Sequence, residues 1–130
     1  MKSLDTNILA RLILADDPAQ AIIAVRLLAE PVWVTTTVWL ELGWLLGKKL
    51  ALDREMVCEA LGTLLAIETV HSDNRDGLLW AIERYRAGAD WADVVHLVMS
   101  RGVGSAFATF DRRIARFAGE GSPLPIETLS

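Results

Sequence analysis

The sequence predicts an α/β fold in which a parallel sheet carries helices on both faces. Short segments rich in β-branched and aromatic residues alternate with longer segments whose apolar residues have helical spacing. Strands that alternate with helices pair in parallel, because each connecting helix packs back on a face of the sheet. The chain has 130 residues, which fits one hydrophobic core. We therefore expect a single domain over residues 1–130, with ligand sites at the carboxyl ends of its strands.

Turn and capping residues divide the first half of the chain. Asp16-Asp17-Pro18 ends the first expected helix and begins the second, because proline suits a first helical turn. The threonines at positions 35–37 can cap a third helix, and Asp53 can begin a fourth. The expected strands cover residues 2–4, 32–34 and 67–70, and the expected helices cover residues 7–15, 18–29, 38–50 and 53–65.

The second half shows the same alternation. Ser72-Asp73 can cap a helix that runs to residue 86, and Asp90 can cap one that ends before Gly102. Residues 105–109 are an expected strand, which their alanine and phenylalanine content predicts to be buried. A short helix is expected over residues 112–117, and a last strand near Ile126.

The composition excludes several classes of protein. Hydrophobic residues make up 52% of the chain and the mean hydropathy is +0.32, which is too apolar for disorder. The longest uncharged stretch, residues 31–40, is shorter than the roughly 18 apolar residues of a membrane-spanning helix. The N-terminus lacks the apolar run of a signal peptide, and a single cysteine excludes an internal disulfide. We therefore expect a cytoplasmic protein with no membrane partner.

The net charge of −4 is unusual for a protein that binds nucleic acid without sequence preference, because phosphate neutralisation favours a basic surplus. This objection weakens if carboxylates cluster around divalent cations, since each cation adds two positive charges. The placement of the acidic residues therefore decides whether the net charge is compatible with a nucleic-acid partner.

Glu41 stands in a segment that is apolar nearly all round, so its helix is expected to be buried. No basic residue lies three or four positions away, so no local ion pair is available. A buried carboxylate must find a charge, a metal or a proton. The alternative is a glutamate at the edge of the helix that reaches water or pairs with a distant arginine.

Asp90 and Asp93 open a helix in the segment DWADVVH. Acids at the N-cap and in the first turn are a common structural pattern, and the cap accounts for Asp90. Their spacing places both carboxylates on one face, where they repel unless a cation or water separates them. Asp93 is therefore a candidate ligand. His96 can support it, or can be an ordinary helix histidine.

Asp5 and Asp111 follow directly on expected strands, so both belong to the same edge of a parallel sheet. Thr6 or Asn7 explains the cap of the first helix better than Asp5 does. Asp111 can also serve as the cap of the short helix that follows it.

The four acids Asp5, Glu41, Asp93 and Asp111 form an oxygen-rich set that suits Mg²⁺ or Mn²⁺. Zinc prefers cysteine and histidine, and the chain has one cysteine and two histidines. The dominant use of such an acidic site is to activate water and neutralise charge in phosphoryl or phosphodiester chemistry.

These motifs, taken in order, resemble a PIN domain. LDTN after the first strand, the glutamate in an apolar helix, DWADVVH and TFD are similar to the VapC-type toxin ribonucleases, over residues 2–117. The resemblance implies an α/β/α sandwich with a four- to five-stranded parallel sheet. It also implies a Mg²⁺- or Mn²⁺-dependent endoribonuclease that cuts RNA, a homodimer, and a small antitoxin protein as partner.

The resemblance also assigns residue roles. It makes Asp5, Glu41, Asp93 and Asp111 the catalytic acids and the metal ligands. The expected supporting residues are Thr6, Asn7, Asp90 and Thr109. Three arginines are candidates for contacts with RNA phosphates, with a solvated helix surface as the alternative: Arg11, Arg112 and Arg113.

Two other families fit the sequence less well. A phosphatase of the haloacid dehalogenase type needs a second aspartate where this chain has Asn7, and also a later lysine. A receiver domain needs an acidic pair before the end of the first strand and a lysine near the last strand, and the chain shows neither. A non-catalytic PIN-like module that binds RNA or protein is the alternative from another class. The intact set of four acids argues against it.

Overall fold

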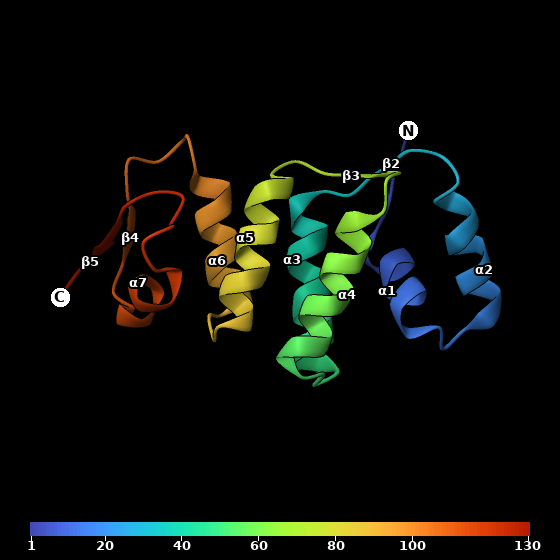
Figure 1. Cartoon of the computed structure of the whole chain (residues 1–130), viewed down its shortest axis with the longest axis horizontal. Coiled ribbons are helices and arrows are strands. Elements are labelled where there is room, and N and C mark those ends of the chain that lie inside the picture. The colour runs from blue at the N-terminus through green and yellow to red at the C-terminus, as the bar shows by residue number, and fades with distance from the viewer. The chain divides into compact units, whose positions relative to one another are not determined.

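The computed structural model describes residues 1–130, which form two compact units, Met1–Arg75 and Asp76–Ser130. The chain colour in Figure 1 runs from blue through green in the first unit and from yellow to red in the second. Each unit has its own parallel sheet and its own helices. The expectation of a single domain stays a prediction.

The first unit contains a three-stranded parallel sheet with the order β1-β2-β3. Its strands are β1 (Lys2–Ser3), β2 (Val32–Trp33) and β3 (Val70–His71). The ladder continues one residue further, because the Leu4 N–H donates to the Trp33 carbonyl and the Val34 N–H to the His71 carbonyl, each at 2.9 Å. The three strands end at one edge, and Asp5 follows the first of them there.

Five helical segments connect these strands. They are α1 (Thr6–Leu14), α2 (Pro18–Leu27), α3 (Thr36–Trp44), η1 (Leu45–Lys49) and α4 (Arg54–Ala66). Three predicted helix starts are confirmed, and each is capped by a side chain. Asp17 accepts from the Gln20 N–H at 3.1 Å, Thr35 caps α3, and Asp53 accepts from the Met56 N–H at 2.8 Å.

The helix predicted over residues 38–50 is an α-helix followed by a π-helical turn. The Leu50 N–H donates to the Leu45 carbonyl at 2.9 Å, five residues back. The apolar pattern predicts one continuous helix here and gives no signal for the π-helical turn.

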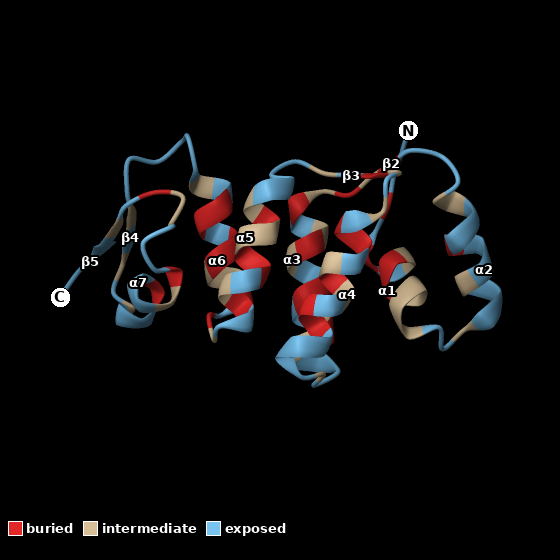
Figure 2. Ribbon diagram, in the orientation of Figure 1, coloured by how far each residue is buried: buried red, intermediate tan, exposed pale blue.

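The fully buried side chains of the first unit come from its sheet and from α1, α3, η1 and α4 (Figure 2). Trp39 in α3 has no exposed surface, and its Nε1 donates to Ser72 Oγ at 2.7 Å. A buried indole needs such a partner for its N–H. This bond links α3 to the segment that follows β3. The fully buried large residues of this unit are Leu9, Val32, Val34, Trp39, Leu42, Leu46, Val57 and Leu61.

The second unit contains α5 (Arg75–Arg86), α6 (Trp91–Ser100), β4 (Phe107–Thr109), α7 (Arg112–Ala118) and β5 (Ile126–Thr128). Strands β4 and β5 pair in parallel, with Phe107 opposite Ile126. A core cluster joins α6, α7 and the segment before β5, and consists of Leu97, Ile114, Ala118 and Leu124. This cluster fixes the start of α7, and with it Asp111, beside β4.

Two expectations about the sheet were wrong. The strands are all parallel, but they pair as sheets of three and two strands and not as one sheet of four to five. The hydrophobic pattern locates strands, whereas pairing depends on contacts between distant segments, and β4 pairs with the last strand of the chain. Strand β4 is also not buried, since Ala108 is exposed and its neighbours are half-buried.

None of the helices combines the length and the apolar content that crossing a bilayer requires.

Candidate active site

Asp5 is the N-cap of α1, and its Oδ1 accepts from the Ile8 N–H at 3.1 Å. The prediction that Thr6 or Asn7 caps this helix was therefore wrong. Asp5 has the extended backbone that an N-cap requires, with φ −90° and ψ 173°, whereas Thr6 is already helical. The cap uses one carboxylate oxygen, so Oδ2 of Asp5 stays free at the exposed end of β1.

Glu41 is exposed, which corrects the expectation that it is buried. It lies on the face of α3 that also carries Trp44, which is 55% exposed, while Trp39 occupies the core. The apolar content of α3 therefore overstates its burial. This outcome matches the alternative in which the glutamate lies at an edge of the helix.

Thr6 and Glu41 form a hydrogen bond although 35 positions separate them. Thr6 is only 7% exposed, and its Oγ1 donates to Glu41 Oε1. Helices α1 and α3 pack on each other, which brings these side chains together. Because Thr6 follows Asp5 directly, the structure places Glu41 near the start of α1. The Oε2 atom of Glu41 keeps its hydrogen-bonding capacity.

The predicted role of Thr6 as a helix cap was wrong. Thr6 is not a cap but the donor that holds one oxygen of Glu41. No local signal reveals this contact, because it depends on the packing of two helices. Asn7 is exposed, and its side chain makes no hydrogen bond.

Arg11 is engaged within its own unit. Its Nε donates to Gln20 Oε1 and its Nη1 to Asp16 Oδ1, each at 2.8 Å. An exposed ion pair of this kind contributes about 0–1 kcal/mol, so an incoming phosphate can displace it. The prediction that Arg11 binds RNA stays a prediction.

Asp90 caps α6 as predicted, and its Oδ2 accepts from the Asp93 N–H at 3.2 Å. The Asp93 side chain is half-buried. Burial raises the pKa of Asp93, and the charges of Asp90 and Asp111 raise this pKa further, while His96 and Arg113 lower it. Three carboxylates of the second unit are therefore close enough for their charges to act on one another.

Asp111 is the N-cap of α7, and Arg113 holds both of its oxygens. Oδ1 accepts from the Arg113 N–H at 2.9 Å and from Nε at 3.1 Å, while Oδ2 accepts from Nη2 at 2.9 Å. These bonds lower the pKa of Asp111. Thr109 Oγ1 accepts from the Asp111 N–H at 2.9 Å, which fixes the backbone at the end of β4.

The predicted acids thus occur as two groups, one in each unit. Asp5 and Glu41 lie at the start of α1, and Asp93 and Asp111 lie with Asp90 at the starts of α6 and α7. No three acidic, histidine or cysteine side chains form a group that could hold a metal ion. The acids of each group offer carboxylate oxygens, which are the ligands that Mg²⁺ and Mn²⁺ prefer, so the chemistry of the side chains fits these cations.

The chain was compared with known protein families. The model of the PIN domain matches residues 2–120. The chain belongs to the PIN domain family. The match includes both units and all four predicted acids. No curated protein and no solved structure matches the chain.

Membership of the PIN domain family confirms the coarse part of the resemblance. PIN domains have an α/β/α fold, and the helices and parallel strands of this chain agree with it. The family indicates a nuclease-type activity on a nucleic acid. The VapC subtype, the homodimer and the antitoxin stay predictions.

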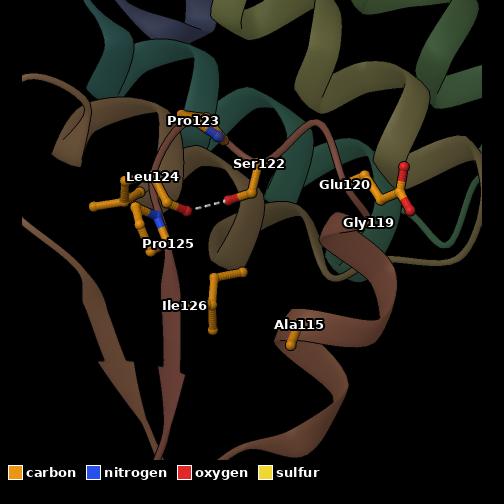
Figure 3. A pocket seen from close by; sticks show the side chains of 8 residues that line it. All are labelled: Ala115, Gly119, Glu120, Ser122, Pro123, Leu124, Pro125 and Ile126. Carbon is orange, nitrogen blue, oxygen red and sulfur yellow. Dashed lines mark hydrogen bonds between the residues drawn. The ribbon is translucent and has the colours of Figure 1, made fainter.

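Two cavities of this PIN domain lie away from the predicted acids. One, of about 400 Å³, lies in the first unit between the start of β1 and the end of α2. The other, of about 500 Å³, lies between α7 and the segment before β5, where Ser122 Oγ donates to the Leu124 carbonyl (Figure 3). Neither is lined by a predicted site residue.

Proposed function

We propose that this PIN domain is a Mg²⁺- or Mn²⁺-dependent endoribonuclease that hydrolyses RNA phosphodiester bonds. The observation that carries the proposal is the position of three carboxylates, Asp90, Asp93 and Asp111, at the starts of α6 and α7, where the charges of Asp90 and Asp111 act on Asp93 and, after burial, raise its pKa. Repelling carboxylates at a strand end and two helix starts are costly unless a cation balances them. The link from Thr6 to Glu41 supports it, because it orders a further acid beside Asp5.

The carboxylates proposed as cation ligands are Asp5 and Glu41 in the first unit and Asp93 and Asp111 in the second. When bound, such a cation makes water more acidic and offsets negative charge on the phosphate. Thr6 fixes Oε1 of Glu41 and leaves Oε2 available. Glu41 and Asp93 are the two candidates to accept the proton of the attacking water. Thr109 and Asp90 hold the backbones of Asp111 and Asp93.

The RNA backbone is proposed to contact arginines beside these acids. Arg112 is exposed and its side chain has no partner, so it can bind a phosphate at once. Arg113 is also exposed, but it is bound to Asp111. The net charge of −4 means that attraction for RNA must come from such local positions.

The biological role we propose is that of a toxin in a toxin–antitoxin pair, acting in the cytoplasm as a homodimer. This part rests on the resemblance of the motifs to VapC-type ribonucleases. A short reading frame for a DNA-binding antitoxin next to the gene is the expected observation.

The test is cleavage of an end-labelled single-stranded RNA of mixed sequence with Mg²⁺, with Mn²⁺ and with chelator. We expect cleavage that needs metal and that Asp5→Asn and Asp93→Asn reduce at least about 100-fold, as for loss of a catalytic charge. Asp53→Asn is the matched control, because Asp53 caps α4 as Asp5 caps α1 but lies outside the proposed site.

Two results oppose the proposal. If Asp53→Asn loses as much activity as Asp5→Asn, capping and not catalysis explains the effect. If the chain binds RNA but neither binds metal nor cuts any RNA offered, the non-catalytic module is the better description.

A further inference from the structure

We propose that Arg113 is the internal counter-ion of the acidic group in the second unit and competes with the divalent cation for Asp111. This inference rests on the proposed role of Asp111 as a metal ligand. It adds a regulatory contact that lies within the chain itself.

The geometry of the pair shows why the two cations compete. Arg113 donates to Oδ1 of Asp111 from Nε and to Oδ2 from Nη2, at 3.1 and 2.9 Å. This two-bond arrangement matches the planar guanidinium to the carboxylate. A metal ion that takes an oxygen of Asp111 must therefore displace at least one of these bonds. The backbone N–H of Arg113 can keep its own bond to Oδ1.

One guanidinium serves more than one carboxylate. Its charge acts on Asp93 and Asp90 as well as on Asp111, and these three acids together raise the pKa of Arg113. His96 is the other group that acts favourably on Asp93. Arg113 thus occupies the electrostatic position that a metal ion would take in this unit. Its positive charge reduces the repulsion among these three carboxylates when no metal is bound.

The exchange requires little rearrangement. The Arg113 side chain is 77% exposed, so it can leave Asp111 by rotating about its own bonds into solvent. Once released, the guanidinium stays within reach of the start of α7 and is free to bind a phosphate. Metal binding and substrate binding are then coupled, because the metal frees an arginine that the substrate uses.

The test measures Mn²⁺ binding to the full chain from the EPR signal of free Mn²⁺, so it does not depend on RNA cleavage. The variants are Arg113→Gln, Arg113→Lys and Arg112→Gln. Arg112→Gln is the matched control, because it removes the same charge from the next residue, whose side chain has no partner. It reports the effect of net charge alone.

We expect Arg113→Gln to bind Mn²⁺ about two- to fivefold more tightly than Arg112→Gln does, the range expected for an exposed ion pair. Arg113→Lys keeps the charge but loses the planar fork, so we expect an intermediate affinity. In an Asp111→Asn background, the difference between the Arg113 and Arg112 variants should disappear.

Equal Mn²⁺ affinities of Arg113→Gln and Arg112→Gln would overturn the inference. If wild-type binding is nevertheless lost in Asp93→Asn, the proposed metal-dependent function still stands. If neither wild type nor Arg113→Gln binds Mn²⁺, both the inference and the proposed metal site are wrong. Binding by Arg113→Gln and not by wild type would be the strongest support for competition.

Discussion

The hydroxyl of Thr6 donates to the carboxylate of Glu41, and this bond joins the start of α1 to the middle of α3. Thr6 is buried and Glu41 is exposed, so a buried hydroxyl fixes the carboxylate of a surface residue. A surface glutamate without such a donor samples several rotamers. Thr6 is thus a positioning residue for Glu41 in the proposed nuclease.

Removing the Thr6 hydroxyl should lower activity more than stability. Thr6→Val keeps the shape of the side chain but leaves Oε1 of Glu41 without its donor. We expect a loss of about 1 kcal/mol in the free energy of unfolding, typical of one hydrogen bond. We also expect kcat for RNA cleavage to fall about tenfold or more with little change in KM, and Thr6→Ser to restore it.

The matched control for this experiment is Thr36→Val. Thr36 is also 7% exposed, and it begins α3, but its side chain does not bond to Glu41. Equal losses of activity in Thr6→Val and Thr36→Val would mean that the hydroxyl acts through general packing and not through Glu41.

Asp93 should destabilise the metal-free protein at neutral pH. Its pKa is raised in the folded state, mainly by burial and by Asp90, so the folded protein holds this proton more tightly than the unfolded chain. The free energy of unfolding therefore falls as the pH rises from about 3.8 through the raised pKa, and then levels off. Asp93→Asn should raise the Tm by about 1–3 °C at pH 7. The gain should vanish near pH 3.

The check is thermal unfolding with chelator at pH 3, 5 and 7. Asp53→Asn, which changes a capping acid of α4, should show no gain at any of these pH values. A gain for Asp93→Asn that persists at pH 3 would point to a cause other than the charge, because aspartic acid is neutral there.

Asp111 should stabilise the folded protein at neutral pH, in contrast to Asp93. Arg113 lowers the pKa of Asp111, so the ionised carboxylate stabilises the folded state. This stabilisation is fully present above the ordinary aspartate pKa of 3.8 and is lost as the pH falls through the lowered pKa of Asp111. Asp111→Asn should therefore lower the Tm at pH 7, by no more than about 2 °C because the pair is exposed.

Thermal unfolding at pH 7 in low and high salt tests this expectation. Salt screens an exposed ion pair, so the difference between Asp111→Asn and wild type should shrink at 1 M NaCl. A higher Tm for Asp111→Asn than for wild type would show that repulsion by Asp90 and Asp93 outweighs the bond to Arg113.

The sequence by itself determined where several of the helices begin and what kind of fold they build. Helices begin after Asp17, Asp53 and Asp90 as expected, and each of these residues caps its helix by a bond to a backbone N–H three residues away. The alternation of strands and helices predicted parallel pairing, and all five strands pair that way. The four motifs in order indicated the PIN domain family, which the comparison confirms.

The tertiary structure decided what depends on distant contacts. Strand order, the exposure of Glu41 and its bond to Thr6 all require segments far apart in the sequence to pack together. The bond from Arg113 to Asp111 spans two positions, but the choice between this partner and solvent depends on the rotamer of a long side chain. Pattern and spacing place residues on an element, and only packing determines which groups they meet.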